Sequence, residues 1–322
     1  MTGIGRFVAW RLLAGCLTVL GALILLFVLV RFVPGDVASI LYGPRASPAL
    51  RADLAERMGL DRPLWEQLWL FLSNAVRGDF GTDVISGRPI FATVIEVLPN
   101  TITLALSALG LSLALGVPLG ALAAARPGGL LDRTLGILSV VLITMPSFVV
   151  AILLLLVFSL ALDWLPVAGA GDAGDPLDRL AHLVLPTLAL ALGWIGYIAR
   201  LVRAALLESL AEPHIQTLRA YGVAEGRIVL IYALRPALVP LVAILGIAMG
   251  DLIGSALFAE IIFSRPGLGS MAFNAVSARN FAVVQATTLV IVVVYVLANI
   301  IVDLANTRLD PRSRRALARS EK

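Results

Sequence analysis

Six apolar stretches dominate the sequence, and each is long enough to cross the hydrocarbon core of a bilayer, which takes about 20 mainly apolar residues. The stretches are 10–32, 100–124, 135–162, 183–202, 236–260 and 283–305. Because lipid offers no hydrogen-bond partners, such stretches fold as helices. Of the 322 residues, 59% are hydrophobic and 14% are charged, against about 25% charged in soluble domains. We therefore expect an all-α integral membrane protein with six transmembrane helices.

Proline and glycine occur inside several of these stretches, including Pro118 and Pro146. Both residue types are tolerated in membrane helices when neighbouring helices satisfy the freed backbone groups. Small residues also let two helices approach closely. We expect Gly110, Gly116 and Gly120 to serve such close packing within the second stretch.

The distribution of arginine predicts the orientation, because basic residues are enriched in short cytoplasmic loops. With a cytoplasmic N-terminus, the inside segments hold Arg6, Arg11, Arg126, Arg133, Arg200, Arg203, Arg219, Arg227, Arg235, Arg308, Arg312, Arg314, Arg315, Arg319 and Lys322. The short outside loops then hold only Arg179, Arg265 and Arg279. We therefore expect both chain termini in the cytoplasm.

A partly polar, arginine-bearing insert at 200–240 separates two of the apolar stretches. Its charges would be unpaired in lipid, so it must emerge from the membrane. Within it, Glu212 suits a helix cap, Pro213 suits the first helical position and Gly222 suits the residue just past the end. The insert is either a short helix that carries movement from a partner into the membrane or an ordinary surface loop.

The long first outer segment, 33–98, has helix signals of its own. Ser47-Pro48 begins one short helix that Gly59 ends, and Asp61 and Pro63 begin a second. In the second helix Leu64, Leu68 and Leu72 share one face and are joined by Trp65 and Trp69. This pattern is typical of a helix on the membrane surface, and it also fits a lid on the outer mouth. Gly78-Asp79-Phe80-Gly81 indicates a turn.

The residue inventory limits the chemistry open to this chain. Its one lysine is the last residue, Lys322, so the phosphate-binding P-loop, which needs a lysine after a glycine-rich turn, is missing. Its two histidines, His182 and His214, are not at metal-ligand spacing, and the single cysteine, Cys16, cannot form an internal disulfide. We expect a chain that is not an enzyme and binds no metal and no nucleic acid; any ATP that drives it is bound by another subunit.

Ionisable residues inside membrane spans are functional candidates by default. Asp251 lies in the middle of GIAMGDLIGSAL. It either lines a translocation path and contacts a cationic part of a substrate, or makes a hydrogen bond to a neighbouring helix. Glu260 lies near the outer end of the same stretch, where a water-facing position is expected. Asp303 and Asn306 lie near the inner end of the last stretch, where partners at the interface are expected.

A series of short motifs runs along nearly the whole chain: RFVPGD (31–36), GLDRPLWEQ (59–67), RGDFG (77–81), LPNTITLAL (98–106), MPSF (145–148), LVLPTLALAL (183–192), YIARLVRAALLESL (197–210), FSRPGLG (263–269) and Asp310-Pro311. In this order and spacing they resemble an ABC-transporter inner-membrane permease subunit of the dipeptide/oligopeptide/nickel family. The long first outer segment resembles one particular member of that family's permease pair. The resemblance implies the type I ABC importer permease fold.

The 200–240 insert resembles the family's coupling segment, the EAA loop, which docks on the cytoplasmic ATPase. Its core is EPHIQTLRAYG (212–222), followed by YALRPALVP (232–240). The resemblance assigns ATPase coupling to Glu212, His214, Ile215, Thr217, Leu218, Arg219, Ala220 and Gly222. Leu218, Tyr221, Tyr232 and Pro236 depart from the residues usual at their positions, which leaves open which ATPase is the partner. One turn apart, Ile215 and Leu218 are expected to form the apolar docking face.

The resemblance also implies the partners and the location. These are a second permease subunit, two cytoplasmic ABC ATPase subunits that bind ATP and magnesium, an external substrate-binding protein, and the bacterial inner membrane. The expected parts are 1–32 (N-terminus and first span), 33–98 (external segment), 99–305 (five-helix core, with the coupling loop at about 203–235) and 306–322 (basic tail). Peptides are the leading substrate class. An ion-coupled secondary transporter that uses Asp251 is the alternative.

Overall fold

A computed structural model describes residues 3–32, 62–83 and 86–309, and within these ranges the chain is helical. The sole β-structure there is an isolated bridge between Thr82 and Pro89. The long helices are α1 (Gly3–Phe32), α5 (Ile90–Ala125), α8 (Pro176–Leu210), α12 (Val239–Ile262) and α14 (Phe281–Leu309). The shorter elements are α4 (Leu64–Arg77), α6 (Leu130–Thr144), α7 (Ser147–Leu154), η1 (Leu155–Ala161), α9 (Pro213–Ala220), α10 (Glu225–Arg227), η2 (Ile228–Ala233), α11 (Leu234–Ala237) and α13 (Leu268–Ser277).

Five of these helices are long and apolar enough to cross a membrane, and a bent pair makes a sixth candidate span. The bent pair is Leu130–Thr144 with Ser147–Ala161, whose axes differ by 102°. The expectation of one continuous helix over 135–162 is therefore wrong. Met145 has an extended backbone (φ −75°, ψ 122°), because the residue before a proline is disfavoured in the helical region. Pro146 thus redirects the chain and does not continue the helix.

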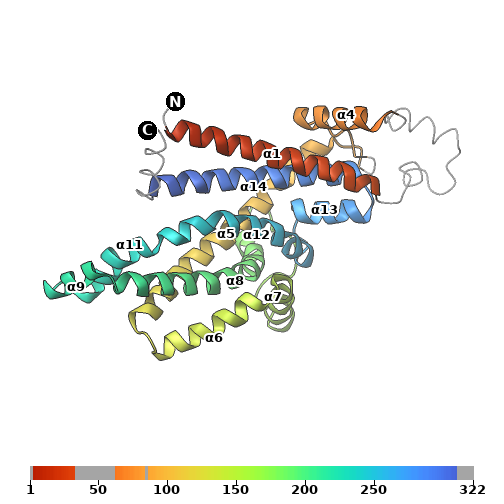
Figure 1. The fold of residues 1–322 in the computed structure, drawn as a ribbon. Coiled ribbons are helices and arrows are strands. Elements are labelled where there is room, and N and C mark those ends of the chain that lie inside the picture. Colours follow the sequence, from red (N-terminus) through yellow and green to blue (C-terminus); the bar gives the residue numbers. More distant parts are fainter. Residues whose placement is uncertain (1–2, 33–61, 84–85, 310–322) are drawn as a thin grey trace.

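The centre of the bundle is the contact between α5 and α8 (Figure 1). A Cβ added at Gly120 would lie 2.5 Å from the carbonyl oxygen of Ala199, and one at Gly116 would lie 2.8 Å from Ile198 Cγ2. Both glycines therefore let the two backbones approach, as predicted. At Gly110 an added Cβ meets nothing within 4 Å, so Gly110 makes no close helix contact among the described residues of this chain, and its packing role stays a prediction.

Helices α1 and α14 lie side by side along one edge of the bundle (Figure 1). Their contact includes a 3.0 Å salt bridge between Arg11 and Asp303, each on its own helix. This confirms the expected partner for Asp303. The N-terminal end of α1, the C-terminal end of α14 and the short helix α9 lie at the same end of the bundle, at the left of Figure 1.

Within the outer segment, residues 62–83 and 86–98 are described, so the helix expected between Ser47 and Gly59 falls outside the described residues. Helix α4 packs beside α1, where Phe71 stacks on Phe27 with ring centroids 5.8 Å apart. Its tryptophans face away, and Trp65 and Trp69 are 69% and 71% exposed. The expected turn at 78–81 is confirmed, because Gly78 and Gly81 both have positive φ.

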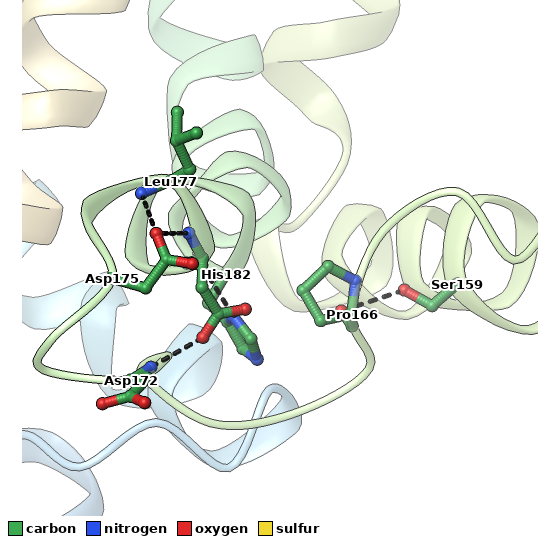
Figure 2. Close-up of polar contacts among 7 residues, drawn as sticks. Ser159, Pro166, Asp172, Asp175, Leu177 and His182 are labelled. Atoms are coloured by element: carbon green, nitrogen blue, oxygen red, sulfur yellow. Dashed lines mark hydrogen bonds and ion pairs between the residues drawn. The ribbon is translucent and has the colours of Figure 1, made fainter.

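A loop between η1 and α8 folds back beside the start of α8 (Figure 2). Asp175 caps α8 by accepting the amide hydrogen of Leu177 at 2.9 Å. The backbone amide of Asp172 donates to Asp178, and the ring of His182 lies 3.2 Å from the other oxygen of that carboxylate. Capping residues therefore hold this loop against the start of α8.

Candidate functional site

The polar insert forms a short helix, α9, that is packed against its own chain. Ile215 is fully buried (0% exposed) in a cluster with Ala124 of α5, Leu206 of α8 and Ile228 of η2. Leu218 is partly buried against the same cluster. Helix α9 is thus fixed to the ends of the spans α5 and α8 and to η2, which excludes the interpretation as an ordinary surface loop.

This packing corrects one prediction about the coupling residues. Ile215 and Leu218 were expected to form an apolar docking face, but a fully buried side chain cannot contact a partner. The prediction is therefore wrong for Ile215, whereas Leu218, which is only partly buried, stays a predicted docking residue. Their apolar side chains stabilise α9 from inside, because burial of an isoleucine is worth about 1.5–3 kcal/mol.

The ends of α9 lie at the cap residues that the sequence predicted. Glu212 is the cap residue and Pro213 takes the first turn. Gly222 follows the helix with φ +76° and donates its amide hydrogen to the carbonyl oxygen of Arg219 at 2.9 Å. This left-handed conformation suits glycine, which lacks a Cβ. The helix therefore ends in a tight turn whose left-handed backbone conformation favours glycine at position 222.

An ion pair spans that turn. Arg219 donates from Nε and Nη2 to the two carboxylate oxygens of Glu225, at 3.1 and 2.6 Å. The hydrogen bond from Arg219 lowers the pKa of Glu225 below its ordinary value and raises that of Arg219. Arg219 therefore pairs with Glu225 of the same chain, on the other side of Gly222, and stabilises the turn. Glu225 was not predicted from the sequence.

The exposed face of α9 carries the remaining predicted residues. His214 is exposed and lies 3.0 Å from the Glu212 carboxylate. Thr217 and Ala220 are exposed, and Tyr221, just after the helix, is 83% exposed. This face is polar except for the Ala220 methyl group and the Tyr221 ring. A partner that approaches α9 from this end of the bundle meets these four residues.

A cavity of about 550 Å³ lies between α8, α12 and the break between α6 and α7. Its lining includes Met145 and Pro146 of the break and Phe148 at the start of α7. Non-helical backbone at membrane depth is tolerated only where protein buries it or where it lines a water-filled cavity. The non-helical backbone at the bend therefore lies where it lines the cavity.

Asp251 lies in this cavity, near the middle of α12. The indole N–H of Trp194 in α8 donates to Asp251 Oδ2 at 2.9 Å. The Trp194 ring meets Tyr197 edge to face, with centroids 5.5 Å apart, and both rings line the cavity. The hydrogen bond to a neighbouring helix is confirmed, and the carboxylate is also exposed to the cavity. That Asp251 lines a translocation path stays a prediction.

Glu260 does not face water as expected. Its side chain is 0% exposed. One carboxylate oxygen accepts the Thr101 hydroxyl hydrogen at 2.5 Å, and the other accepts the amide hydrogen of Ser270 at 2.9 Å. The expectation was wrong because the FSRPGLG segment returns over the end of α12, and Gly267 and Gly269 leave room for the carboxylate. Glu260 therefore holds the start of α13 against α5.

Sequence reasoning missed the aromatic wall of the cavity. Trp194 lies in the middle of a 35-residue span, whereas membrane tryptophans are enriched at the two interfaces. That unusual depth was the available signal. In the described part of the chain, no three His, Cys, Asp or Glu side chains gather where they could hold a metal ion.

Comparison with known proteins places this architecture in a family. Residues 116–315 match the family described as "Binding-protein-dependent transport system inner membrane component". Residues 4–105 match the family described as "Binding-prot-dependent transport system membrane comp, N-term". Together these two matches cover almost all of the chain.

Similar curated proteins agree with these matches. The "Probable peptide ABC transporter permease protein y4tP" of Sinorhizobium fredii is 36% identical over 90% of this chain and 93% of its own length. The "Probable D,D-dipeptide transport system permease protein DdpB" of Escherichia coli K12 is 36% identical over 92% and 94%. The "Glutathione transport system permease protein GsiC" of the same strain is 33% identical over 96% and 99%.

Among solved structures, a chain of the inward-facing MetNI methionine ABC transporter matches with a TM-score of 0.53 and 23% identity. The match covers 70% of this chain and 96% of that chain, and it shows the type I ABC importer permease fold. By fold, family match and curated relatives, the chain belongs to the inner-membrane components of binding-protein-dependent transport systems, as an ABC-transporter permease of the dipeptide/oligopeptide/nickel family.

Proposed function

We propose that this chain is one permease subunit of an ATP-driven importer in the bacterial inner membrane, and that α9 is its contact with a cytoplasmic ATPase subunit. The observation that carries this proposal is the burial of Ile215 between α5, α8 and η2. A force on the exposed side of α9 acts through that cluster on the membrane helices, because a close-packed interior transmits displacement.

The path from α9 to the cavity is short and continuous. Helix α8 carries Leu206 beside α9 and Trp194 beside the cavity. On the other side, Ile228 of η2 leads through α11 into α12, which carries Asp251. The α8 wall, which carries Trp194, and the α12 wall, which carries Asp251, are therefore both connected to α9 through helices. Movement of α9 changes the distance between these two walls.

The proposed orientation puts α9 and both chain termini in the cytoplasm. Arginine is concentrated in the segments at that end of the molecule, as the positive-inside rule requires. Two such permeases form the path, and each contacts one of two ATPase subunits that bind ATP and magnesium. An external binding protein delivers substrate at the opposite end, where α4 and α13 lie. ATP-driven closure of the ATPases then switches the path from inward-open to outward-open.

Peptides or related small solutes are the proposed substrates. The similar permeases are named for peptide, D,D-dipeptide and glutathione transport. All three names describe small molecules that contain amide bonds. No bond in the substrate has to break for it to pass, so the chain acts as a translocator.

A cross-linking experiment tests the contact with the ATPase. The chain has one natural cysteine, Cys16, so Cys16→Ser gives a cysteine-free background. Tyr221→Cys in that background, where the native side chain is 83% exposed, is treated with a short bifunctional reagent in native membranes. We expect a cross-linked product that contains a P-loop ATPase.

The matched control is Val76→Cys in α4, because Val76 is equally exposed (87%) but lies at the opposite end of the bundle. It should give no ATPase product. A complex without any ATPase, or equal cross-linking from both positions, would contradict the proposed contact.

A further inference from the structure

Within the described residues, the one charged side chain that lines the cavity is negative, which favours a positively charged ligand. Among its lining residues Asp251 is the one charged side chain, and none of the salt bridges in the described residues involves it. Trp194 donates to Oδ2, while Oδ1 receives no hydrogen bond from the described residues. A carboxylate at membrane depth is costly unless it is paired, so a cation at Oδ1 would complete the site.

The surroundings of Asp251 select the kind of cation. Trp194 and Tyr197 present aromatic rings beside the carboxylate, and aromatic faces attract organic cations. Ser255 lies one helical turn after Asp251 and also lines the cavity, as a neutral hydrogen-bonding group. The remaining wall is mainly apolar. A hard metal ion prefers several oxygen ligands, which this wall does not supply; an ammonium group with an apolar body fits it better.

The size and position of the cavity agree with a small organic ligand. A volume of about 550 Å³ falls within the range of about 300–1,000 Å³ usual for such sites. Asp251 and Trp194 both lie near the middle of their helices. The cavity is therefore at the depth where many membrane transporters hold their substrate.

We propose that Asp251, with the rings of Trp194 and Tyr197, forms a binding subsite for a primary ammonium group, supplied by the α-amino end of a peptide. This proposal rests on the proposed transport function and adds what the path itself recognises. The hydrogen bond from Trp194 holds the carboxylate in place, and the ammonium group binds the free oxygen. The apolar wall from Met145 to Phe148 then contacts the first side chain of the peptide.

The test measures binding to the assembled transporter, without nucleotide and without the binding protein, by equilibrium dialysis. The probes are radiolabelled alanyl-alanine, its N-acetyl form, its C-terminal amide and N-acetyl-lysyl-alanine. We expect the two probes with an α-ammonium group to bind about tenfold more tightly than acetylated alanyl-alanine, which corresponds to about 1.4 kcal/mol. Binding of the lysyl probe as tight as, or tighter than, that of the two α-ammonium probes would overturn the assignment to the α-amino end.

Asp251→Asn should abolish the preference for ammonium, and Asp251→Glu should retain most of it. Equal binding of free and acetylated alanyl-alanine by the unaltered transporter, or a preference that survives in Asp251→Asn, would overturn the proposal. Failure of every probe to bind would overturn it as well. The comparison of probes on the unaltered transporter decides the matter even if Asp251→Asn does not assemble.

Failure of this inference is distinguishable from failure of the proposed function. Co-purification with an ATPase and ATP hydrolysis by the complex are measured on the same preparation, and neither depends on what Asp251 binds. A complex that hydrolyses ATP but ignores acetylation refutes the subsite alone. A chain without an ATPase refutes the transport proposal.

Discussion

Truncation of Ile215 gives the sharpest test of how α9 is held. Ile215→Ala removes three carbon atoms from a side chain that is 0% exposed. At about 0.8 kcal/mol per buried methylene, the lost transfer free energy is about 2.4 kcal/mol. The cavity left beside Leu206 and Ile228 adds to this, so we expect about 3 kcal/mol. That weakens the docking of α9 on the bundle about 100-fold.

Two measurements report the effect in the assembled transporter. Hydrogen exchange of the α9 amides should accelerate about 100-fold, because exchange follows the local opening free energy. Stimulation of ATP hydrolysis by the binding protein should fall, because α9 no longer moves with α8. Ile215→Val, at a cost of about 1 kcal/mol, should give a smaller change in the same direction.

Ile231→Ala is the matched control, since it removes the same atoms from a nearby isoleucine that is 54% exposed. It should leave the exchange of α9 amides nearly unchanged. If Ile215→Ala and Ile231→Ala behave alike, or if Ile215→Ala exchanges faster but couples normally, the reasoning from burial to coupling is refuted.

Three further predictions concern other contacts. Gly120→Val should lower the thermal stability of the chain, because the added Cβ would lie 2.5 Å from the Ala199 carbonyl oxygen, whereas Gly110→Val, with nothing within 4 Å, should not; equal melting temperatures would contradict the close contact. Glu260→Gln should destabilise the docking of α13 by about 2 kcal/mol, because an amide N–H₂ would face either Thr101 or the Ser270 amide. The exposed Glu96→Gln should leave that docking unchanged. Thermal unfolding followed by a probe on α13 measures the difference in stability. The folded-state pKa of Glu225 is lowered from 4.5, so its support of the α9 turn is complete above that value and is lost as pH falls through the folded pKa. The protection of the amides near Gly222, measured relative to intrinsic exchange at each pH, should therefore fall at acidic pH, and Glu225→Gln should remove that dependence.

Much of the fold follows from periodicity and composition. Five of the six apolar stretches overlap the five single-helix candidate spans, and the sixth overlaps the bent pair. Length and apolar character decide which segments enter a membrane. The caps of α9 are also local, so Glu212, Pro213 and Gly222 could be predicted from residue type. Each of these features depends on a few neighbouring residues and on no distant contact.

The features that were not predicted depend on contacts between distant segments. Ile215 is buried because η2 and the end of α8 meet beside it. Glu260 is buried because Thr101, 159 residues away, donates to it. The bend at Pro146 was unpredictable for a related reason, since proline inside a membrane helix either continues or redirects it according to what packs beside the freed backbone.

The central claim is that ATP hydrolysis by partner subunits drives transport through this chain. The most direct measurement is uptake of a radiolabelled peptide into proteoliposomes that contain this permease, its co-purified partners and the binding protein. We predict uptake that requires ATP hydrolysis on the side of α9 and that proceeds without any ion gradient. Uptake by the chain alone, driven by a proton or sodium gradient and lost in Asp251→Asn, would contradict this account and identify an ion-coupled secondary transporter.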